Sequence, residues 1–347
     1  MTKQSGELLK LFKNTLFTNP KDIFYLTDCP FDGFWLFILN GEYIIISSKM
    51  MFVQCEGFFN PFFKVVQAEA GFSSALVALC KEKNVNSVKI DSQSVTLADF
   101  ETIKAVLSVS DITLQPEKGL LNLSRYVKTD EEISRIKQAC RIVSEVFDEI
   151  KKEIKAGSTE LDVHYKILEK FAARRVTESF TPIVAFGENA ASPHHASSAR
   201  RLKEDDIILI DMGCKYKGYA SDLTRTFFLG KINVKYQQVF DIVLNAQKSA
   251  INALKAGIAA STVDTAARSV ISQAGYGACF IHSTGHGLGI DVHESPQMGE
   301  KSKETLKSGC VITVEPGIYL PDEFGVRIED TVLITETGYE VLTNAEY

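Results

Sequence analysis

An internal repeat in the C-terminal part of the chain restricts its fold more than any other feature of the sequence. In the first half a helical pattern ends at the Lys-Ala-Gly tripeptide 155–157, and a Ser/Thr-led helix follows near 158–174. In the second half a helix near 235–253 leads to Lys-Ala-Gly at 255–257 and a Ser/Thr-led helix near 261–274. The repeat predicts two similar halves that pack together. The alternative is coincidence, because glycine commonly caps helix C-termini.

Each half of the repeat continues with histidines and then with a predicted β-hairpin that carries two carboxylates. In the first half Asp211 and Asp222 are equidistant from the hairpin midpoint at 216–217, so a regular register would place them opposite each other. In the second half Glu315 and Glu329 are likewise symmetric about the middle of their hairpin. The two halves therefore supply two carboxylate pairs for one shared site.

Opposed carboxylates repel each other, and burial beside apolar strand residues disfavours their charges unless cations neutralise them. Four carboxylates match two divalent cations and suggest bridging ligands. His286 completes the set, because it lies in the glycine-rich run 285–294, where three glycines let the backbone pass close to the metals. The predicted metal ligands are Asp211, Asp222, His286, Glu315 and Glu329.

Other interpretations of the same residues exist. Taken singly, an Asp at a strand end is usually a turn residue, and a buried His is usually a hydrogen-bonded core residue. A structural calcium site would use the carboxylates but would leave the additional histidines unexplained. The combination of two carboxylate pairs with a histidine favours catalytic metals.

The N-terminal part is predicted to be a separate α/β domain. Its expected elements are a β-hairpin at 34–47 around Asn40-Gly41, helices near 72–83 and 97–107, and a strand at 87–91. Thr129 and Glu132 form a capping box that opens a long helix reaching about Lys155. We therefore expect domains at residues 1–124 and 125–347.

Composition excludes several classes of partner and compartment. A net charge of −6 argues against binding to nucleic acid. The seven cysteines are scattered and odd in number, which argues against a disulfide framework or a thiolate zinc site and favours the cytoplasm. The sequence has neither a signal-like N-terminus nor an 18-residue apolar run, so no membrane association is expected.

Several stretches around the candidate ligands carry a family pattern: 179–184, 193–194, 210–213, 221–226, 285–296, 313–319 and 325–330. With these residues the sequence resembles the creatinase/aminopeptidase family, and within it the Xaa-Pro peptidases, prolidase and aminopeptidase P. The similarity extends more weakly to the N-terminal part through residues 22–27. It implies an α+β fold in which a pseudo-symmetric pita-bread catalytic domain follows a smaller α/β creatinase-like domain. Methionine aminopeptidases lack that N-terminal domain and fit less well.

The resemblance also implies roles for individual residues. Asp222 and Glu329 would bridge the two metals, and His194 and His293 would contact the substrate outside the metal shell. Arg327 would orient a ligand carboxylate. The implied substrates are short proline-containing peptides, cleaved between the N-terminal residue and proline. A homodimer is also implied.

The mechanism that we hypothesise uses a hydroxide bridging the two metals to attack the scissile carbonyl. Glu315 would carry the proton to the leaving nitrogen. His194 and His293 would stabilise the oxyanion or hold the proline ring. Carboxylates with one imidazole favour Mn²⁺ or Co²⁺, and Zn²⁺ and Fe²⁺ stay open.

One departure from the family pattern bears on substrate length. Some prolidases place an arginine directly after the His-Glu-x-Pro motif to bind the carboxylate of a dipeptide, whereas Gln297 stands there in this chain. This favours an aminopeptidase, unless Arg200, Arg201 or the N-terminal domain compensates for the missing charge. The competing functions are a non-catalytic peptide-binding protein and a metal-free, creatinase-like amidinohydrolase on the same fold.

Overall fold

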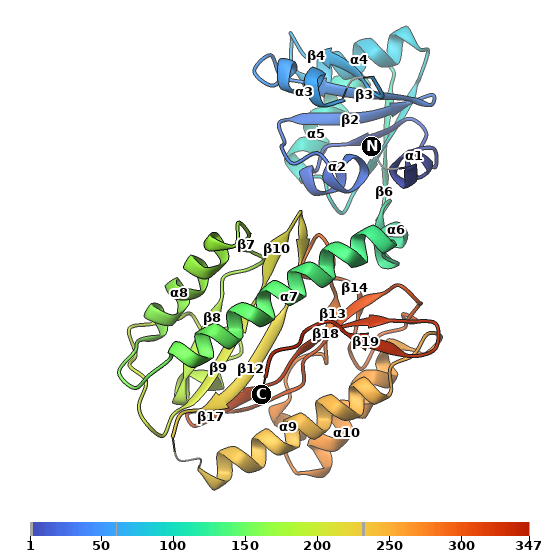
Figure 1. The fold of residues 1–347 in the computed structure, drawn as a ribbon. Coiled ribbons are helices and arrows are strands. Elements are labelled where there is room, and N and C mark those ends of the chain that lie inside the picture. The colour runs from blue at the N-terminus through green and yellow to red at the C-terminus, as the bar shows by residue number, and fades with distance from the viewer. Residues whose placement is uncertain (1–2, 60, 231–232, 347) are drawn as a thin grey trace. The chain divides into compact units, whose positions relative to one another are not determined.

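The computed structural model describes residues 3–59, 61–230 and 233–346, and the chain divides into two compact units, residues 1–123 and 124–347 (Figure 1). All seven cysteines are unpaired, as the sequence predicts. Within the described ranges, no helix is both long and apolar enough to cross a membrane.

The N-terminal unit is a mixed sheet with helices on both faces. The described strands, in sheet order, are β4 (Lys64–Gln67), β3 (Glu42–Ser47), β2 (Phe34–Leu39), β1 (Thr15–Phe17), β5 (Ser87–Asp91) and β6 (Thr113–Glu117). The helices are α1 (Lys3–Leu9), α2 (Pro20–Thr27), α3 (Phe52–Phe59), α4 (Phe72–Glu82) and α5 (Leu97–Ser108). The predicted helices near 72–83 and 97–107 and the strand at 87–91 are thereby confirmed.

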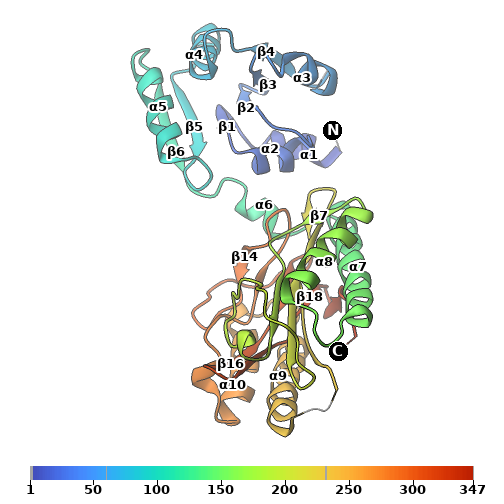
Figure 2. The ribbon, with the colours of Figure 1, turned by 90° about the vertical axis from the view of Figure 1, so that its left-hand side faces the viewer.

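The predicted hairpin at 34–47 is also confirmed. β2 pairs antiparallel with β3, and Asn40 and Gly41 have φ angles of +50° and +87°, as a type I′ turn requires. Alternate side chains of β2 enter different cores, Leu36 on the side of α1, α2 and α3 and Phe37 on the side of α4 and α5. Figure 2 shows this layering of helices on both sides of the sheet.

The C-terminal unit contains the predicted repeat. After α6 (Asn122–Tyr126), its helices are α7 (Asp130–Glu153), α8 (Glu160–Ala173), α9 (Val234–Asn252) and α10 (Ala260–Gln273). The capping box predicted at Thr129 is present at the start of α7. In the first half the Gly157 amide donates to the Leu202 carbonyl (2.9 Å), and in the second the Gly257 amide donates to Leu306 (2.8 Å). Such matching contacts are not expected from a coincidental pair of helix endings.

The strands of this unit lie between the two helix pairs (Figure 1). The sheets, in strand order, are β12 (Leu223–Phe228), β9 (Ile207–Met212) and β8 (Ile183–Phe186); β11 (Tyr219–Ala220), β10 (Cys214–Tyr216) and β7 (Thr177–Glu178); β14 (Glu294–Gln297), β13 (His286–Gly287), β15 (Val311–Val314), β18 (Asp330–Ile334) and β19 (Tyr339–Val341); and β16 (Gly317–Leu320) with β17 (Phe324–Arg327). Ile208 and Ile210 of β9 enter the core beneath α7 and α8, whereas Leu209 enters the core beneath α9 and α10. Packing on both faces fixes β9 between the halves.

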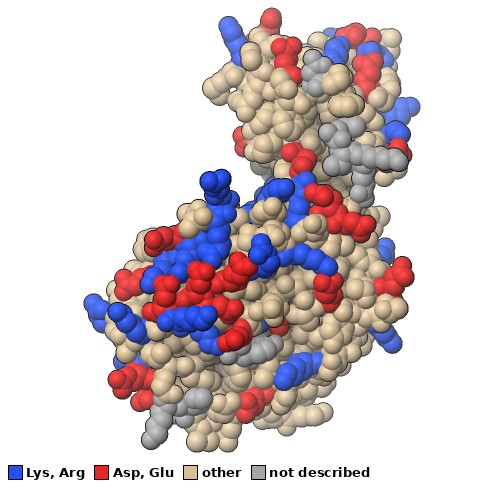
Figure 3. All heavy atoms as spheres, viewed as in Figure 1, with Lys and Arg blue, Asp and Glu red and all other residues tan. Residues whose placement is uncertain are grey.

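The surface over α7 and α8 carries interspersed acidic and basic side chains (Figure 3). Lys170 of α8 contacts Glu149 (3.1 Å) and Glu153 (2.7 Å) of α7, and Arg174 contacts Glu149 (2.5 Å). Ion pairs at the protein surface are screened by water and contribute little to stability. The buried apolar contacts beneath the helices therefore dominate their packing.

Candidate metal centre

The first carboxylate hairpin forms, but its register differs from the prediction. Asp211 pairs with Thr224 in the β9–β12 ladder, whereas Asp222 precedes β12. The turn is centred on Lys217 and Gly218, whose φ angles are +47° and +84°. A type I′ turn needs the left-handed conformation at both central residues, and glycine adopts it without strain. The prediction that Asp211 and Asp222 lie directly opposite each other is therefore wrong.

The second carboxylate hairpin has the predicted register. Val314 pairs with Asp330 and Gly317 pairs with Arg327, so both pairs are centred on residue 322. Glu315 and Glu329 are centred on the same residue and lie between the β15–β18 and β16–β17 ladders. The predicted midpoint of the hairpin is therefore confirmed, but the two residues are not a ladder pair: the Glu315 amide donates to the Thr284 carbonyl (2.8 Å) and the Glu329 amide donates to the Thr224 carbonyl (3.0 Å).

Residues from both hairpins meet at a buried imidazole. Asp222, His286 and Glu329 are buried, and their candidate ligand atoms all lie within 4.8 Å of one another. His286 Nε2 lies 3.7 Å from Asp222 Oδ2 and 3.2 Å from Glu315 Oε1. The structure thus brings together four of the five predicted ligands: Asp222, His286, Glu315 and Glu329. The first and the last of them, Asp222 and Glu329, are 107 residues apart in the chain.

Asp211, the fifth predicted ligand, borders the same cluster and is held by Arg327. Arg327 Nη2 lies 2.6 Å from Asp211 Oδ2. Burial and then the negative charge of Asp211 raise the pKa of Asp222. Arg327 thus contacts a candidate ligand carboxylate, as the family resemblance implied.

Three further residues of this site were given no role from the sequence: Thr224, Tyr319 and His282. The Thr224 hydroxyl donates to Glu329 Oε2 (2.7 Å) and accepts from Arg327 Nε (3.2 Å). Tyr319 Oη accepts from Arg327 Nη1 (2.7 Å) and lies 2.9 Å from His282 Nε2. Strand periodicity could have indicated Thr224, because it lies two residues from Asp222. The Tyr319–His282 contact has no such signal in the sequence.

The carboxylates of the cluster carry more negative charge than the surrounding protein compensates. Burial raises the pKa of Asp211, and burial together with neighbouring carboxylates raises the pKa of Asp222 and Glu329 well above the usual value. Burial also opposes the charges of Glu315 and His286, but their mutual attraction prevails, lowering the pKa of Glu315 and raising that of His286. Glu315 and His286 thus compensate each other's charge, and Arg327 partly offsets the charge of Asp211.

Two oxygens of the cluster have unsatisfied hydrogen-bonding capacity. Asp211 Oδ1 and Glu329 Oε1 are buried and have no hydrogen-bond partner among the described residues. Buried polar atoms are rarely left in this state. Divalent cations would bind both oxygens and stabilise the ionised carboxylates, so this set of oxygen donors and one imidazole fits such ions.

The glycine-rich run supplies His286 as expected, but its glycines permit close contact with neighbouring strands. A Cβ atom at Gly285 would lie 2.1 Å from the Thr313 carbonyl oxygen, and one at Gly287 would lie 2.1 Å from the Ser295 carbonyl oxygen. Any other residue would displace these strands. The structure therefore explains these glycines by backbone packing, whereas the sequence suggested an approach to the metals.

His293, one of the two histidines expected to contact substrate, lies beside this cluster. The ring of His293 is centred 4.4 Å from that of His286. Burial and then the positive charge of His286 lower the pKa of His293, and His194 acts in the same direction. The adjacent His195 instead contacts Glu160, with Nε2 2.8 Å from Oε2.

Comparisons with known proteins agree with these features. Residues 134–336 match metallopeptidase family M24, and residues 12–127 match the creatinase/prolidase N-terminal domain. The chain is 38% identical over 339 residues to an uncharacterized peptidase of Staphylococcus saprophyticus. The aligned region covers 95% of this chain and 94% of the relative.

Two solved structures resemble the whole chain. An Xaa-Pro dipeptidase from Bacillus anthracis is 30% identical, with a TM-score of 0.93 over 99% of this chain and 98% of that chain. An X-Pro aminopeptidase from Thermotoga maritima is 30% identical, with a TM-score of 0.88 over 96% and 95% of the two chains. The matches confirm the predicted fold, a creatinase-like N-terminal domain followed by a pita-bread domain.

Proposed function

The chain belongs to metallopeptidase family M24, and we propose that it is an Xaa-Pro peptidase that hydrolyses the bond between an N-terminal residue and proline. The observation that carries the proposal is the buried carboxylate cluster, in which Asp211 Oδ1 and Glu329 Oε1 have no described partner. The similarity to an Xaa-Pro dipeptidase and an X-Pro aminopeptidase along nearly the whole chain supports the same reaction.

We assign two divalent ions to the site, which Asp222 and Glu329 would help to hold. The full proposed ligand set is Asp211, Asp222, His286, Glu315 and Glu329. The donor types favour Mn²⁺ or Co²⁺, and Zn²⁺ or Fe²⁺ would also match them. When bound, such ions lower the pKa of coordinated water and polarise the scissile carbonyl.

The protein side chains orient the ligands and move the proton. Arg327 holds Asp211, and the Thr224 hydroxyl holds Glu329, so that each directs its other oxygen into the cluster. Glu315 would accept the proton of the attacking water and pass it to the proline nitrogen. His293, whose pKa is lowered, would be neutral and would bind the substrate carbonyl, with His194 beside it.

Within this reaction we favour an aminopeptidase that acts on Xaa-Pro-Yaa peptides. Gln297 pairs with His286 across the β13–β14 ladder, and its neutral amide offers no charged contact for a dipeptide carboxylate. Arg200 is bound by Glu188 and Asp206, and Arg201 donates to the Gly157 carbonyl. In this arrangement neither arginine replaces the missing charge.

Metal quantification and a peptide panel on the full chain test the proposal. After loading with Mn²⁺ or Co²⁺, we expect two bound ions per chain and cleavage of an Xaa-Pro-Yaa tripeptide, with no cleavage of the matching Xaa-Ala-Yaa peptide. Asp222→Asn should lose both metal and activity. Peptide binding without metal or cleavage would instead identify a binding protein, and metal-independent creatine hydrolysis an amidinohydrolase. A strong preference for the Xaa-Pro dipeptide would refute the aminopeptidase assignment.

We further propose that the protein works as a homodimer in the cytoplasm. The dimer is an expectation from the family resemblance, and the location is an expectation from the cysteine usage. Light scattering on the purified chain and fractionation of the source cells would test the two statements separately.

A further inference from the structure

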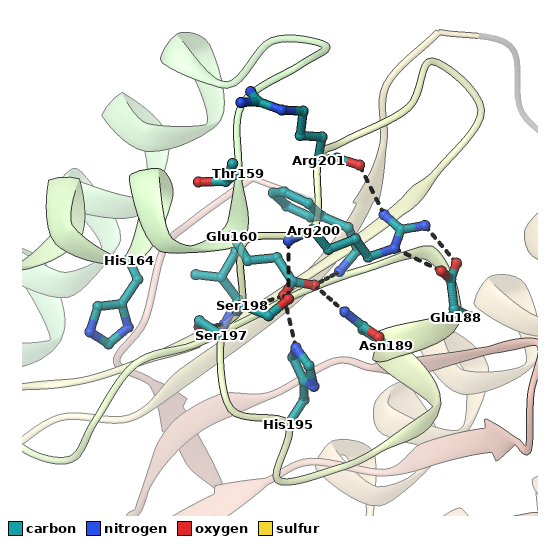
Figure 4. A network of polar contacts seen from close by, with 12 residues as sticks. Thr159, Glu160, His164, Glu188, Asn189, His195, Ser197, Ser198, Arg200 and Arg201 are labelled. Carbon is teal, nitrogen blue, oxygen red and sulfur yellow. Dashed lines mark hydrogen bonds and ion pairs between the residues drawn. The ribbon is translucent and has the colours of Figure 1, made fainter.

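The loop that carries His194 is anchored on one buried carboxylate. Glu160, the first residue of α8, is 0% exposed. Five donors from the segment 186–198 reach its two oxygens: the Phe186 amide (2.9 Å) and Asn189 Nδ2 (2.9 Å) at Oε1, and His195 Nε2 (2.8 Å), the Ser198 amide (2.8 Å) and Ser198 Oγ (2.6 Å) at Oε2. Figure 4 shows these side chains converging on Glu160.

The Glu160 carboxylate is not needed to begin its helix. Thr159 and Asp162 already form a capping box, in which the Asp162 amide donates to Thr159 Oγ1 (3.0 Å) and the Thr159 amide donates to Asp162 Oδ2 (2.8 Å). An isolated carboxylate is costly to bury, so a helix start alone does not explain Glu160. Its donors come from the loop, and the loop is therefore what its charge organises.

The carboxylate is held in its ionised form by these contacts. Burial opposes the charge, but the hydrogen bonds from Ser198, Asn189 and His195 outweigh burial and lower the pKa of Glu160. Removing the charge would leave several loop donors without a strong acceptor, which is more disruptive than losing one exposed contact. The loop conformation between Asn189 and Ser198, which includes His194, therefore depends on Glu160.

The second half of the repeat uses a similar device. Asp264 of α10 is 0% exposed and accepts from the Thr284 amide (3.1 Å) and the Thr284 hydroxyl (2.9 Å). Thr284 lies two residues before His286. In both halves a buried carboxylate on the second helix thus holds the segment that brings a histidine to the site.

We infer that Glu160 and His195 are positioning residues that set the place of His194 against the bound peptide. His195 Nε2 donates to the Glu160 carboxylate, so the two neighbouring histidines have different tasks: His195 fixes the loop, and His194 faces the substrate. The inference rests on the proposed function in one respect, the contact of His194 with substrate. The anchoring itself does not depend on it.

The kinetic test uses Glu160→Gln and His195→Leu in the full, metal-loaded chain. Each should lower kcat by about 10- to 100-fold, because small displacements of a substrate-contacting group have effects of this size, with bound metal unchanged. His195→Gln keeps a donor for Glu160 and should restore most of kcat. Glu188→Gln, a change of the same type in the same loop at an exposed ion pair with Arg200, is the matched control and should leave kcat unchanged.

A double-mutant cycle separates positioning from general damage. If Glu160 acts through His194, Glu160→Gln should have no further effect on kcat in a His194→Ala background. An equal loss in both backgrounds would overturn the inference.

Hydrogen exchange of the amides of residues 187–199 gives a readout that is independent of activity. Exchange there should be faster in Glu160→Gln and His195→Leu than in Glu188→Gln, with the melting temperature of each variant as a check on folding. Unchanged exchange would overturn the inference. If the unaltered chain cleaves no Xaa-Pro peptide, the proposed function fails, and faster exchange would still support the anchoring.

Discussion

The hydroxyl of Thr224 links two charged groups of the metal centre, and its removal offers a sensitive test of the proposed ligand arrangement. Thr224 is fully buried in β12. It donates to Glu329 Oε2 (2.7 Å) and accepts from Arg327 Nε (3.2 Å). Thr224→Val replaces the hydroxyl by a methyl group of similar size, so both charged partners lose a hydrogen bond while the packing volume is retained.

The expected effect follows from these two contacts. A hydrogen bond to a charged group contributes about 1.5–3 kcal/mol, and about 1.4 kcal/mol corresponds to a tenfold change in affinity. The Thr224 hydroxyl also favours the ionised form of Glu329, and a metal ligand must be ionised. We therefore expect Thr224→Val to bind Mn²⁺ about 10- to 100-fold more weakly, in line with the loss of other residues that orient ligands.

Calorimetric titration of the chelated full chain with Mn²⁺ measures this change. Thr15→Val is the matched control, because Thr15 is a buried strand threonine of the N-terminal unit whose hydroxyl donates to the Lys13 carbonyl (3.2 Å). It should lose some stability without a change in Mn²⁺ affinity. If Thr224→Val binds Mn²⁺ as tightly as the unaltered chain, the hydroxyl does not support a metal ligand and the argument for Glu329 is refuted.

Three further predictions concern protonation, the substrate and its length. The melting temperature of the chelated protein should fall as pH rises from about 5 to about 8, because the raised pKa values of Asp222 and Glu329 let the folded state keep protons that the unfolded state has lost. Added Mn²⁺ should make the melting temperature less dependent on pH. A melting temperature that rises with pH would contradict this reasoning. His293→Ala should lower kcat by about 100-fold with metal content unchanged by elemental analysis, and loss of metal would contradict its role. Gln297→Arg should raise kcat/KM for an Xaa-Pro dipeptide relative to the tripeptide by about tenfold, and an unchanged ratio would show that residue 297 does not contact the carboxylate.

Local patterns predicted the elements and half of the ligand geometry. The capping box at Thr129 and the turn at Asn40-Gly41 place a helix start and a hairpin correctly, because each depends on residues close in sequence. The midpoint predicted for the second hairpin, halfway between Glu315 and Glu329, was also correct, because it too depends on residues close in sequence. The midpoint of the first hairpin was wrong, since its turn is selected by where glycine is available, at residue 218, and not by the symmetry of the carboxylates.

Contacts between distant segments could not be derived in this way. Thr224 reaches Glu329 across 105 residues, and Glu160 reaches Ser198 across 38 residues. No period or motif relates such pairs, because their proximity results from tertiary packing, between the two halves for Thr224 and Glu329 and within the first half for Glu160 and Ser198. The anchoring of the His194 loop on Glu160 is therefore visible only in the folded chain.

The amino-acid sequence by itself determined which chemistry is available: four carboxylates, one imidazole and two similar halves to carry them. Tertiary structure decided which of these groups share a site and what charge state each favours. Burial and mutual repulsion oppose ionisation of Asp222 and Glu329, whereas the contact between His286 and Glu315 favours both charges. These energies depend on distance and on exclusion of water, and both quantities exist only once the halves have packed.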